Sequence, residues 1–200
     1  MEIETEFNTE KKNQHYIPKF FLRNFSYESN GKQIGLFNIK ANKFHQTGKL
    51  KKQGSKSFFY GHDGFIEDCL SKMEGEISST IQGIIINRNL PKQNSEEYGN
   101  LLLFIALTHL RNPVIIDIIK EQRRHLEERV NEDLPDGARK TLLSKITHEY
   151  AIALALSSLN DITNHIIDLN CKLLINTTSI PFITSDFPIV KYNQFLELRK

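Results

Sequence analysis

Two polar residues near the N-terminus lie among aromatic side chains and have types that could take part in chemistry. His15 begins the segment HYIPKFFLRNF, and Arg23 lies inside it. A neutral imidazole can ligate a metal ion or act as a base, and a guanidinium can neutralise a phosphate. The alternative is structural: the aromatic side chains fill the core, and His15 is hydrogen-bonded to the backbone.

Two glutamates, Glu67 and Glu74, are seven residues apart in a segment with helical periodicity. Seven residues are close to two helical turns, so both side chains project in nearly the same direction, at the border of the apolar stripe. Two carboxylates there could hold a hard divalent cation, which prefers oxygen ligands. Equally, glutamates at such a border commonly reach solvent and bind nothing.

Two further ionisable residues lie at the edges of apolar elements. Arg111 follows His109 and a fully apolar stretch, just before Pro113. An arginine at the edge of a core needs a carboxylate, a carbonyl or an anionic ligand, so an ion pair and anion binding both stay open. Asp186 stands in the sequence TSDFP, where it either caps a turn or presents a functional acid. We expect Arg111 and Asp186 to approach each other or to share a ligand, because each needs a counter-charge.

Charge is distributed unevenly along the chain. The net charge is only +2, but residues 11–62 hold eleven Lys and Arg against one acid, Glu28. A local positive field attracts polyanions even on a nearly neutral protein, so Lys51 and Lys52 are candidates for contact with an anionic substrate. The alternative is that these lysines only keep an exposed hairpin and its loops soluble.

Composition limits the class of protein. The chain has 200 residues, of which 39% are hydrophobic and 25% charged, as in an ordinary globular domain. Apolar runs such as 101–107 are far short of the roughly 20 residues that span a bilayer, so we expect no membrane association. The acidic N-terminus and the two cysteines favour a cytoplasmic location. No phosphate-binding loop, dinucleotide fingerprint or HExxH, GxSxG or CxxC motif is present.

The elements that must position these residues follow from periodicity and breakers. We expect residues 1–12 to be disordered and residues 13–200 to form a single, mostly helical α+β domain. An N-terminal β-hairpin, three long helices and a C-terminal β-hairpin are predicted. The first hairpin is expected at 33–40 with 43–46, and the second at 172–176 with 182–184. The first helix is capped by Asp63 and runs to near Arg88. The second helix starts at Asn94, is kinked or interrupted near Asn112 by Pro113, and is followed by a turn at 134–137; the third runs from 138 to about 169 with a break near Ser157.

Two end motifs resemble those of a known family. The segments NQHYIPKFFLRNF (13–25) and FITSDFPIV (182–190) are similar to the signatures of the family called domain of unknown function 4238, which is widespread and mainly bacterial. The helix with Glu67 and Glu74, and Arg111 before Pro113, fit the pattern between them. The resemblance implies a pocket gathered from distant points: His15, Arg23, Glu67 or Glu74, Arg111 and Asp186. Family members run on into further β-structure, so we expect this chain to be short of the family's C-terminal part.

Two functional hypotheses fit these residues. The first is a metal-assisted hydrolase that resembles a nuclease and acts on an anionic substrate, in a setting such as phage defence. Its catalytic residues would be His15, Glu74 and Asp186; its divalent metal would be held by His15, Glu67, Glu74 and Asp186; and its substrate would contact Arg23, Arg111, Lys51 and Lys52. The alternative is a non-catalytic module that binds nucleic acid or a protein partner through the basic residues 11–62.

Overall fold

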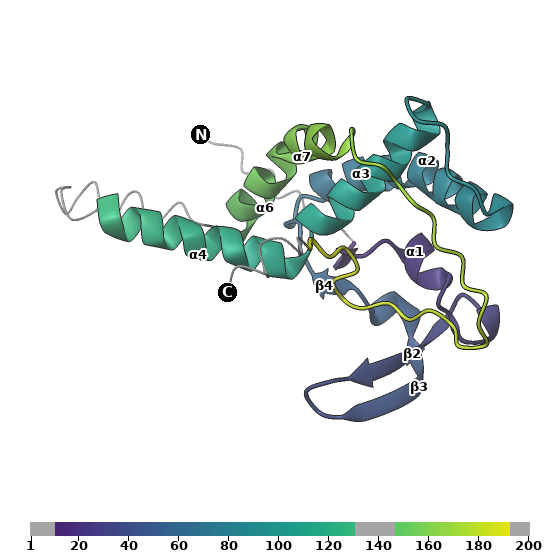
Figure 1. The fold of residues 1–200 in the computed structure, drawn as a ribbon. Helices are drawn as coiled ribbons and strands as arrows, with labels where there is room; N and C mark the ends of the chain where they lie inside the picture. Colours follow the sequence, from purple (N-terminus) through teal and green to yellow (C-terminus); the bar gives the residue numbers. More distant parts are fainter. Residues whose placement is uncertain (1–10, 131–146, 193–200) are drawn as a thin grey trace, which may run out of the picture.

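The structure, a computed structural model, describes residues 11–130 and 147–192 and has the α+β class expected from the sequence (Figure 1). Long helices form one part of the molecule, and two short antiparallel sheets lie beside them. In chain order the elements are β1 (Asn13–His15), α1 (Lys19–Arg23), η1 (Tyr27–Ser29), β2 (Gln33–Asn38), β3 (Lys43–Lys49), η2 (Leu50–Lys52), β4 (Ser55–Ser57), α2 (Phe65–Asn87), α3 (Glu96–Leu110), α4 (Pro113–Val130), α6 (His148–Ser157) and α7 (Leu159–Ile166).

Helix α3 is the centre of the helical part. It packs against α2, α4, α6 and α7, and the side chains of Leu102, Ala106 and Leu107 are almost completely buried. A helix that is apolar on all sides can be stable in water only when other elements cover it, and this confirms the central place predicted for 101–107. The N-terminal segment joins the same core, because Phe20 and Phe21 pack against Phe104 with ring centroids 5.9 and 5.4 Å apart.

The predicted interruption at Pro113 is a corner between two helices. The axes of α3 and α4 differ by 58° in direction. Pro113 is the first residue of α4. The backbone N–H at this position has no partner within a helix, so proline loses no helical hydrogen bond there. Asn112 caps this helix: its side-chain Oδ1 accepts a hydrogen bond of 3.0 Å from the amide of Val114. The sequence Asn-Pro therefore ends one helix and begins the next.

The two sheets are small and antiparallel. Strands β2 and β3 form the predicted N-terminal hairpin, in which Phe37 pairs with Phe44. Strand β1 pairs with β4, and Asn13 lies opposite Ser57. This second pairing was not predicted, because strands of three residues are too short to show an alternating pattern.

The third predicted helical stretch is divided. Thr147 caps α6 through its hydroxyl, which accepts a hydrogen bond from the Tyr150 amide, and a break at Ser158 separates α6 from α7. The break lies next to the predicted position. Residues 138–146, which were also expected to be helical, lie outside the described part of the chain.

The expected C-terminal hairpin differs from the structure in detail. Residues 171–192, which we call the strap, run as an extended chain with no strand ladder among them (Figure 1). Their apolar residues have the types found in strands, but Leu174 is 80% exposed and Ile183 is 91% exposed. Asn176 and Ile180 hydrogen-bond within the turn between the two predicted strands. A strand needs a partner for its backbone groups, and strand propensity alone does not provide one.

Two other expectations concern the N-terminus and membranes. Residues 1–10 of the expected disordered segment lie outside the described residues, but Lys12 is held, because its carbonyl accepts a 2.8 Å hydrogen bond from the Phe58 amide. Among the helices within 11–130 and 147–192, no single one is long and apolar enough to cross a membrane; α3 and α4 reach that length and composition only as a bent pair.

Candidate functional site

A buried ion pair between helices is the main polar feature of the core. Arg111 follows α3, and its side chain is only 2% exposed; its Nη1 donates a hydrogen bond of 2.8 Å to Oε1 of Glu74 on α2. The Glu74 side chain is 26% exposed, so the pair lies at the edge of the core with the carboxylate toward water. The Nε of Arg111 has no hydrogen-bond partner among the described residues. Arg111 therefore has the carboxylate that a buried guanidinium requires, and a donor to spare.

Tyr60 lies beside this ion pair and connects it to the N-terminal strand. Its ring is 2% exposed, and its hydroxyl donates a 3.0 Å hydrogen bond to the carbonyl of His15. Burial raises the pKa of Tyr60 far above its ordinary value, so the phenol stays neutral. Gln14 is completely buried. Its side-chain amide donates a hydrogen bond to the Gly61 carbonyl and accepts one from the Tyr60 amide. These bonds hold β1 beside the ion pair.

The second helix carboxylate, Glu67, has an altered acidity. Burial raises its pKa above the ordinary value, and the negative charge of Glu74 raises it further, although Arg111 acts in the opposite direction. A carboxyl group in such a place holds its proton to higher pH than an exposed one. The two glutamates expected to project together are therefore close enough to influence each other. We call Arg111, Glu74, Glu67, Tyr60 and His15 the Arg111 centre.

His15 is buried and bonded to the backbone. Its Nε2 lies 3.1 Å from the carbonyl oxygen of Lys51, to which it donates. Burial, and then the positive charge of Lys19, lower the pKa of His15 to about 4. The ring is therefore neutral at pH 7, with one nitrogen committed to the carbonyl. This is the geometry of the structural alternative described for His15.

Asp186 lies near the centre but not in it. Its side chain is exposed, and its backbone carbonyl accepts a 2.7 Å hydrogen bond from Nδ2 of Asn112. Next to it, Phe187 stacks on the ring of His109 with centroids 5.6 Å apart. Asp186 was expected to provide a counter-charge for Arg111. In the structure Glu74 provides that charge, and the Asp186 backbone is bonded to Asn112, the residue after Arg111.

The remaining predicted residues lie on the surface. The side chains of Arg23, Lys51 and Lys52 are exposed, and Lys51 meets His15 through its backbone carbonyl only. Within residues 11–130 and 147–192, no three His, Cys, Asp or Glu side chains are grouped as a metal ion would need. The metal-binding role considered for His15, Glu67, Glu74 and Asp186 stays a prediction. The catalytic and substrate-binding roles considered for all these residues stay predictions.

A cavity lies elsewhere, between the end of α2 and the start of α3. It has a volume of about 560 Å³, and its polar wall includes Glu76, Thr80, Glu97 and Asn100. No residue of the Arg111 centre lines it.

Several residues of the polar core were missed by sequence reasoning. Tyr60, Gln14 and Asn112 have no distinctive spacing, although Asn directly before Pro113 is a recognisable helix cap. His148 is a further example, since its two ring nitrogens contact the Lys120 ammonium at 2.8 Å and the Phe59 carbonyl at 2.9 Å. This ring joins α4, α6 and the loop that carries Tyr60.

Fold and site together define an α+β domain in which the N-terminal segment lies beside a buried arginine between helices, and a C-terminal strap is bonded to the residue after that arginine. The family model described as "Protein of unknown function (DUF4238)" matches residues 13–200, and the chain belongs to this family. The resemblance found in the two end motifs is thus confirmed. No curated protein and no solved structure matches the chain.

Proposed function

We propose that the protein is a non-catalytic module that binds nucleic acid, and that residues 11–62 contact the phosphates. The observation that carries the proposal is a run of positive charge without acidic partners among the residues that the structure describes. Residues 29–62 contain seven lysines and no acidic residue, and all seven lysine side chains are exposed. Lysines so placed contact phosphates by charge alone, with little preference for sequence.

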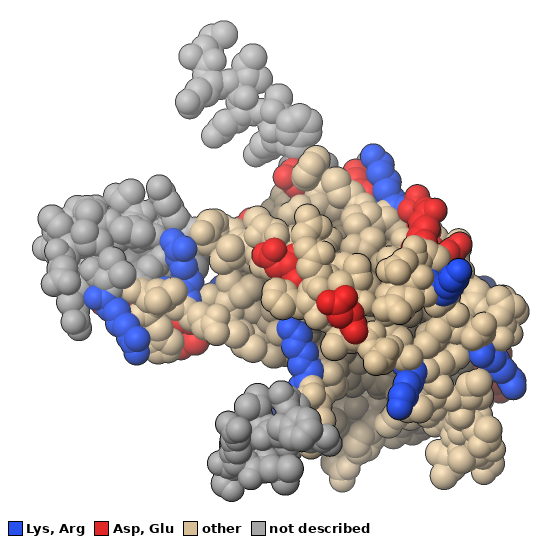
Figure 2. Space-filling model, turned by 45° about the horizontal axis from the view of Figure 1, so that its top comes forward, with Lys and Arg blue, Asp and Glu red and all other residues tan. Residues whose placement is uncertain are grey.

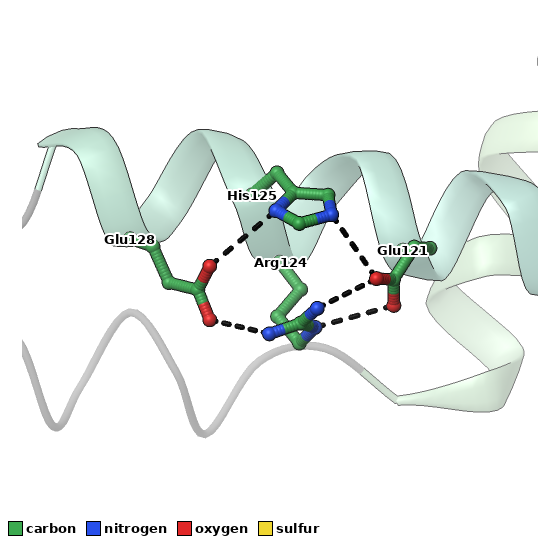
Figure 3. A network of polar contacts seen from close by, with 4 residues as sticks. All are labelled: Glu121, Arg124, His125 and Glu128. Carbon is green, nitrogen blue, oxygen red and sulfur yellow. Dashed lines mark hydrogen bonds and ion pairs between the residues drawn. The ribbon is translucent and has the colours of Figure 1, made fainter.

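The ion pairs of the structure separate this region from the rest. Of the eleven basic side chains in residues 11–62, Lys11 is the one that forms an ion pair within the described part of the chain, with Asp68. By contrast, Arg124 on α4 is bonded to both Glu121 and Glu128, and His125 lies between the same two carboxylates (Figure 3). On α4 the positive charge of Arg124 is neutralised locally, whereas the lysines of residues 29–62 form no ion pair with any acid in the described part of the chain.

The surface view shows how charge is distributed on one face of the molecule. Seen with the top of Figure 1 turned forward, positive and negative side chains are interspersed (Figure 2). An interspersed surface produces no strong field at a distance, because opposite charges cancel. A region with lysines alone attracts polyanions in spite of the small net charge of the whole protein.

A second candidate, a hydrolase of anionic substrates, rests on the Arg111 centre. Arg111 has a buried Nε without a partner among the described residues, and it lies close to Glu67, a carboxyl with a raised pKa. A carboxyl group with a raised pKa suits a general acid, and a guanidinium suits a phosphate. We place this candidate second, because Arg111 is 2% exposed and already paired with Glu74.

The proposal is tested by binding of fluorescent oligonucleotides, measured by anisotropy at several salt concentrations. We expect binding at about 50 mM salt that weakens steeply as salt is added. Changing Lys49, Lys51, Lys52 and Lys56 to Gln should reduce the slope of log affinity against log salt, measured with duplex DNA, by up to about 3.6, since each lost phosphate contact on a duplex removes about 0.9. The matched control changes four exposed lysines elsewhere, Lys72, Lys92, Lys172 and Lys191, and should leave the slope unchanged.

Absence of binding at low salt, or an equal effect of the two sets of substitutions, contradicts the proposal. Mg²⁺ or Mn²⁺ added to the bound complex then separates the two candidates. If the metal ion causes cleavage of the oligonucleotide and Glu67→Gln abolishes that cleavage, the protein is the hydrolase and not the non-catalytic module. Binding without cleavage agrees with the module.

A further inference from the structure

The β2–β3 hairpin carries two phenyl rings on its outer face. Phe37 is 60% exposed and Phe44 is 65% exposed, and the two residues are direct partners across the antiparallel pair. Side chains of cross-strand partners lie on the same face of the sheet. Below the Phe44 ring lies Gly35, where a Cβ atom would be 3.6 Å from the ring. The two rings therefore form an exposed aromatic platform next to bare backbone.

The hairpin is anchored to the body of the protein through its opposite face. The opposite face has Ile34, which is 6% exposed and packs in a small core with Ile17, Leu22 and Leu50. Leu36, on the same inner face, fills the space above Gly48. The hairpin is therefore fixed from one side and extends from the edge of the body, away from the helices (Figure 1). Two exposed aromatic rings on the same face of a hairpin form a patch, and such a patch indicates a contact surface where a singly exposed ring does not.

The charges around the platform indicate what it contacts. Lys32, Lys40, Lys43 and Lys49 belong to the hairpin and its ends, and no acidic residue occurs between 29 and 62. Phenyl rings next to lysines match the two parts of a single-stranded nucleic acid, because bases stack on the rings while phosphates lie beside the ammonium groups. In a duplex the faces of the bases are already stacked on one another and cannot reach the rings.

We infer that the Phe37–Phe44 platform binds single-stranded nucleic acid by stacking bases on its rings, with the hairpin lysines on the adjacent phosphates. This inference rests on the proposed function and narrows it. The lysines provide affinity for any nucleic acid, and the platform provides preference for unpaired strands. Stacking is sequence-tolerant, because every base has an aromatic face.

The protein has no tryptophan, which allows a direct test. In Phe44→Trp the new indole is the only one, and a base stacked on it quenches its fluorescence. The control is Phe65→Trp, which replaces a ring that is 68% exposed at the start of α2, outside the hairpin. We expect a single-stranded oligonucleotide to quench Phe44→Trp strongly and a duplex to quench it little. Phe65→Trp should respond to neither.

A double variant, Phe37→Leu with Phe44→Leu, measures the contribution to affinity. We expect affinity for the single strand to fall about tenfold or more, with affinity for the duplex and the salt slope unchanged. Both side chains are mostly exposed, so the variant should unfold at the wild-type temperature.

The outcomes separate the inference from the proposed function. If the double variant binds single strands as tightly as the wild type, or if Phe44→Trp is not quenched, the platform does not stack bases. The lysine result can still stand in that case. If the wild type binds neither single strands nor duplex, the proposed function and this inference both fail.

Discussion

Removing the charge of Glu74 should destabilise the protein strongly, because it leaves Arg111 buried without its ion-pair partner. In Glu74→Gln the side chain keeps its shape and one acceptor oxygen, so the change isolates the charge. Breaking a buried pair by removing one partner costs about 3–5 kcal/mol. We expect a loss near the lower end, about 3 kcal/mol, since Glu74 is 26% exposed and water screens part of the interaction. Glu67 also remains close to the guanidinium.

The assay is equilibrium unfolding in urea, with thermal unfolding as a second measurement. A loss of about 3 kcal/mol corresponds to a fall in Tm of about 6–12 °C for a chain of this size. The matched control is Glu76→Gln on the same helix, whose side chain is exposed and forms no ion pair among the described residues. Its effect should stay within about 0.5 kcal/mol.

The double variant Arg111→Met with Glu74→Gln completes the cycle. Once the guanidinium is gone, the charge of Glu74 has nothing to neutralise, so the double variant should cost less than the sum of the single ones. A coupling of about 2 kcal/mol is expected for two groups in direct contact. If Glu74→Gln behaves like Glu76→Gln, or if the two single effects add, the reasoning on the buried pair is refuted.

Two more predictions concern stability. Burial is the first cause that lowers the pKa in the folded protein of three histidines, His15 (to about 4), His109 and His148. In the unfolded chain these histidines bind protons at a pH at which the folded rings stay neutral, so the free energy of unfolding should fall as pH drops below about 6.5. The loss from His15 alone should reach about 3 kcal/mol by pH 4. Urea midpoints that stay level from about pH 7 to pH 5 would contradict this. Gly54→Ala should lower the thermal midpoint clearly, because Gly54 has φ +60° and its new Cβ would lie 2.7 Å from Cβ of Ile17. Gly31→Ala is the control, because Gly31 has a similar φ but open space around it. If both substitutions lower the midpoint equally, the close contact with Ile17 contributes nothing and backbone strain alone explains the loss.

Much of the fold could be predicted because its elements have their own local signals. Helix α2 follows from apolar residues at helical spacing, the α3–α4 corner from Asn112 and Pro113, and the β2–β3 hairpin from strand-forming residues around a turn. The β1–β4 pair has no such signal, since each strand has three residues and their partners are about 40 residues apart. The strap has the residue types of strands, but a strand forms only where another backbone is available to pair with it.

The sequence predicts that a buried arginine needs an acidic partner, but it does not predict which acidic residue that is. Arg111 needed a carboxylate, and it has one, but the sequence suggested Asp186 where the structure has Glu74. The choice depends on how α2 is rotated against α3, and this rotation is set by the packing of many side chains at once. Tyr60 was missed for a related reason: its importance comes from complete burial beside the ion pair, which no spacing reveals.

Among the described residues, few contacts attach the strap to the helical corner, and this has a consequence for the dynamics of the native state. Near Asp186 it is held by one hydrogen bond from Asn112, across 74 residues of sequence, and by the stack of Phe187 on His109. Segments with few buried contacts open locally at a free energy far below that of global unfolding. Hydrogen exchange in the strap should therefore proceed by such local opening, while the amides of α3 exchange only when the whole domain unfolds. Each local opening gives solvent brief access to the end of α3, with the helices still in place.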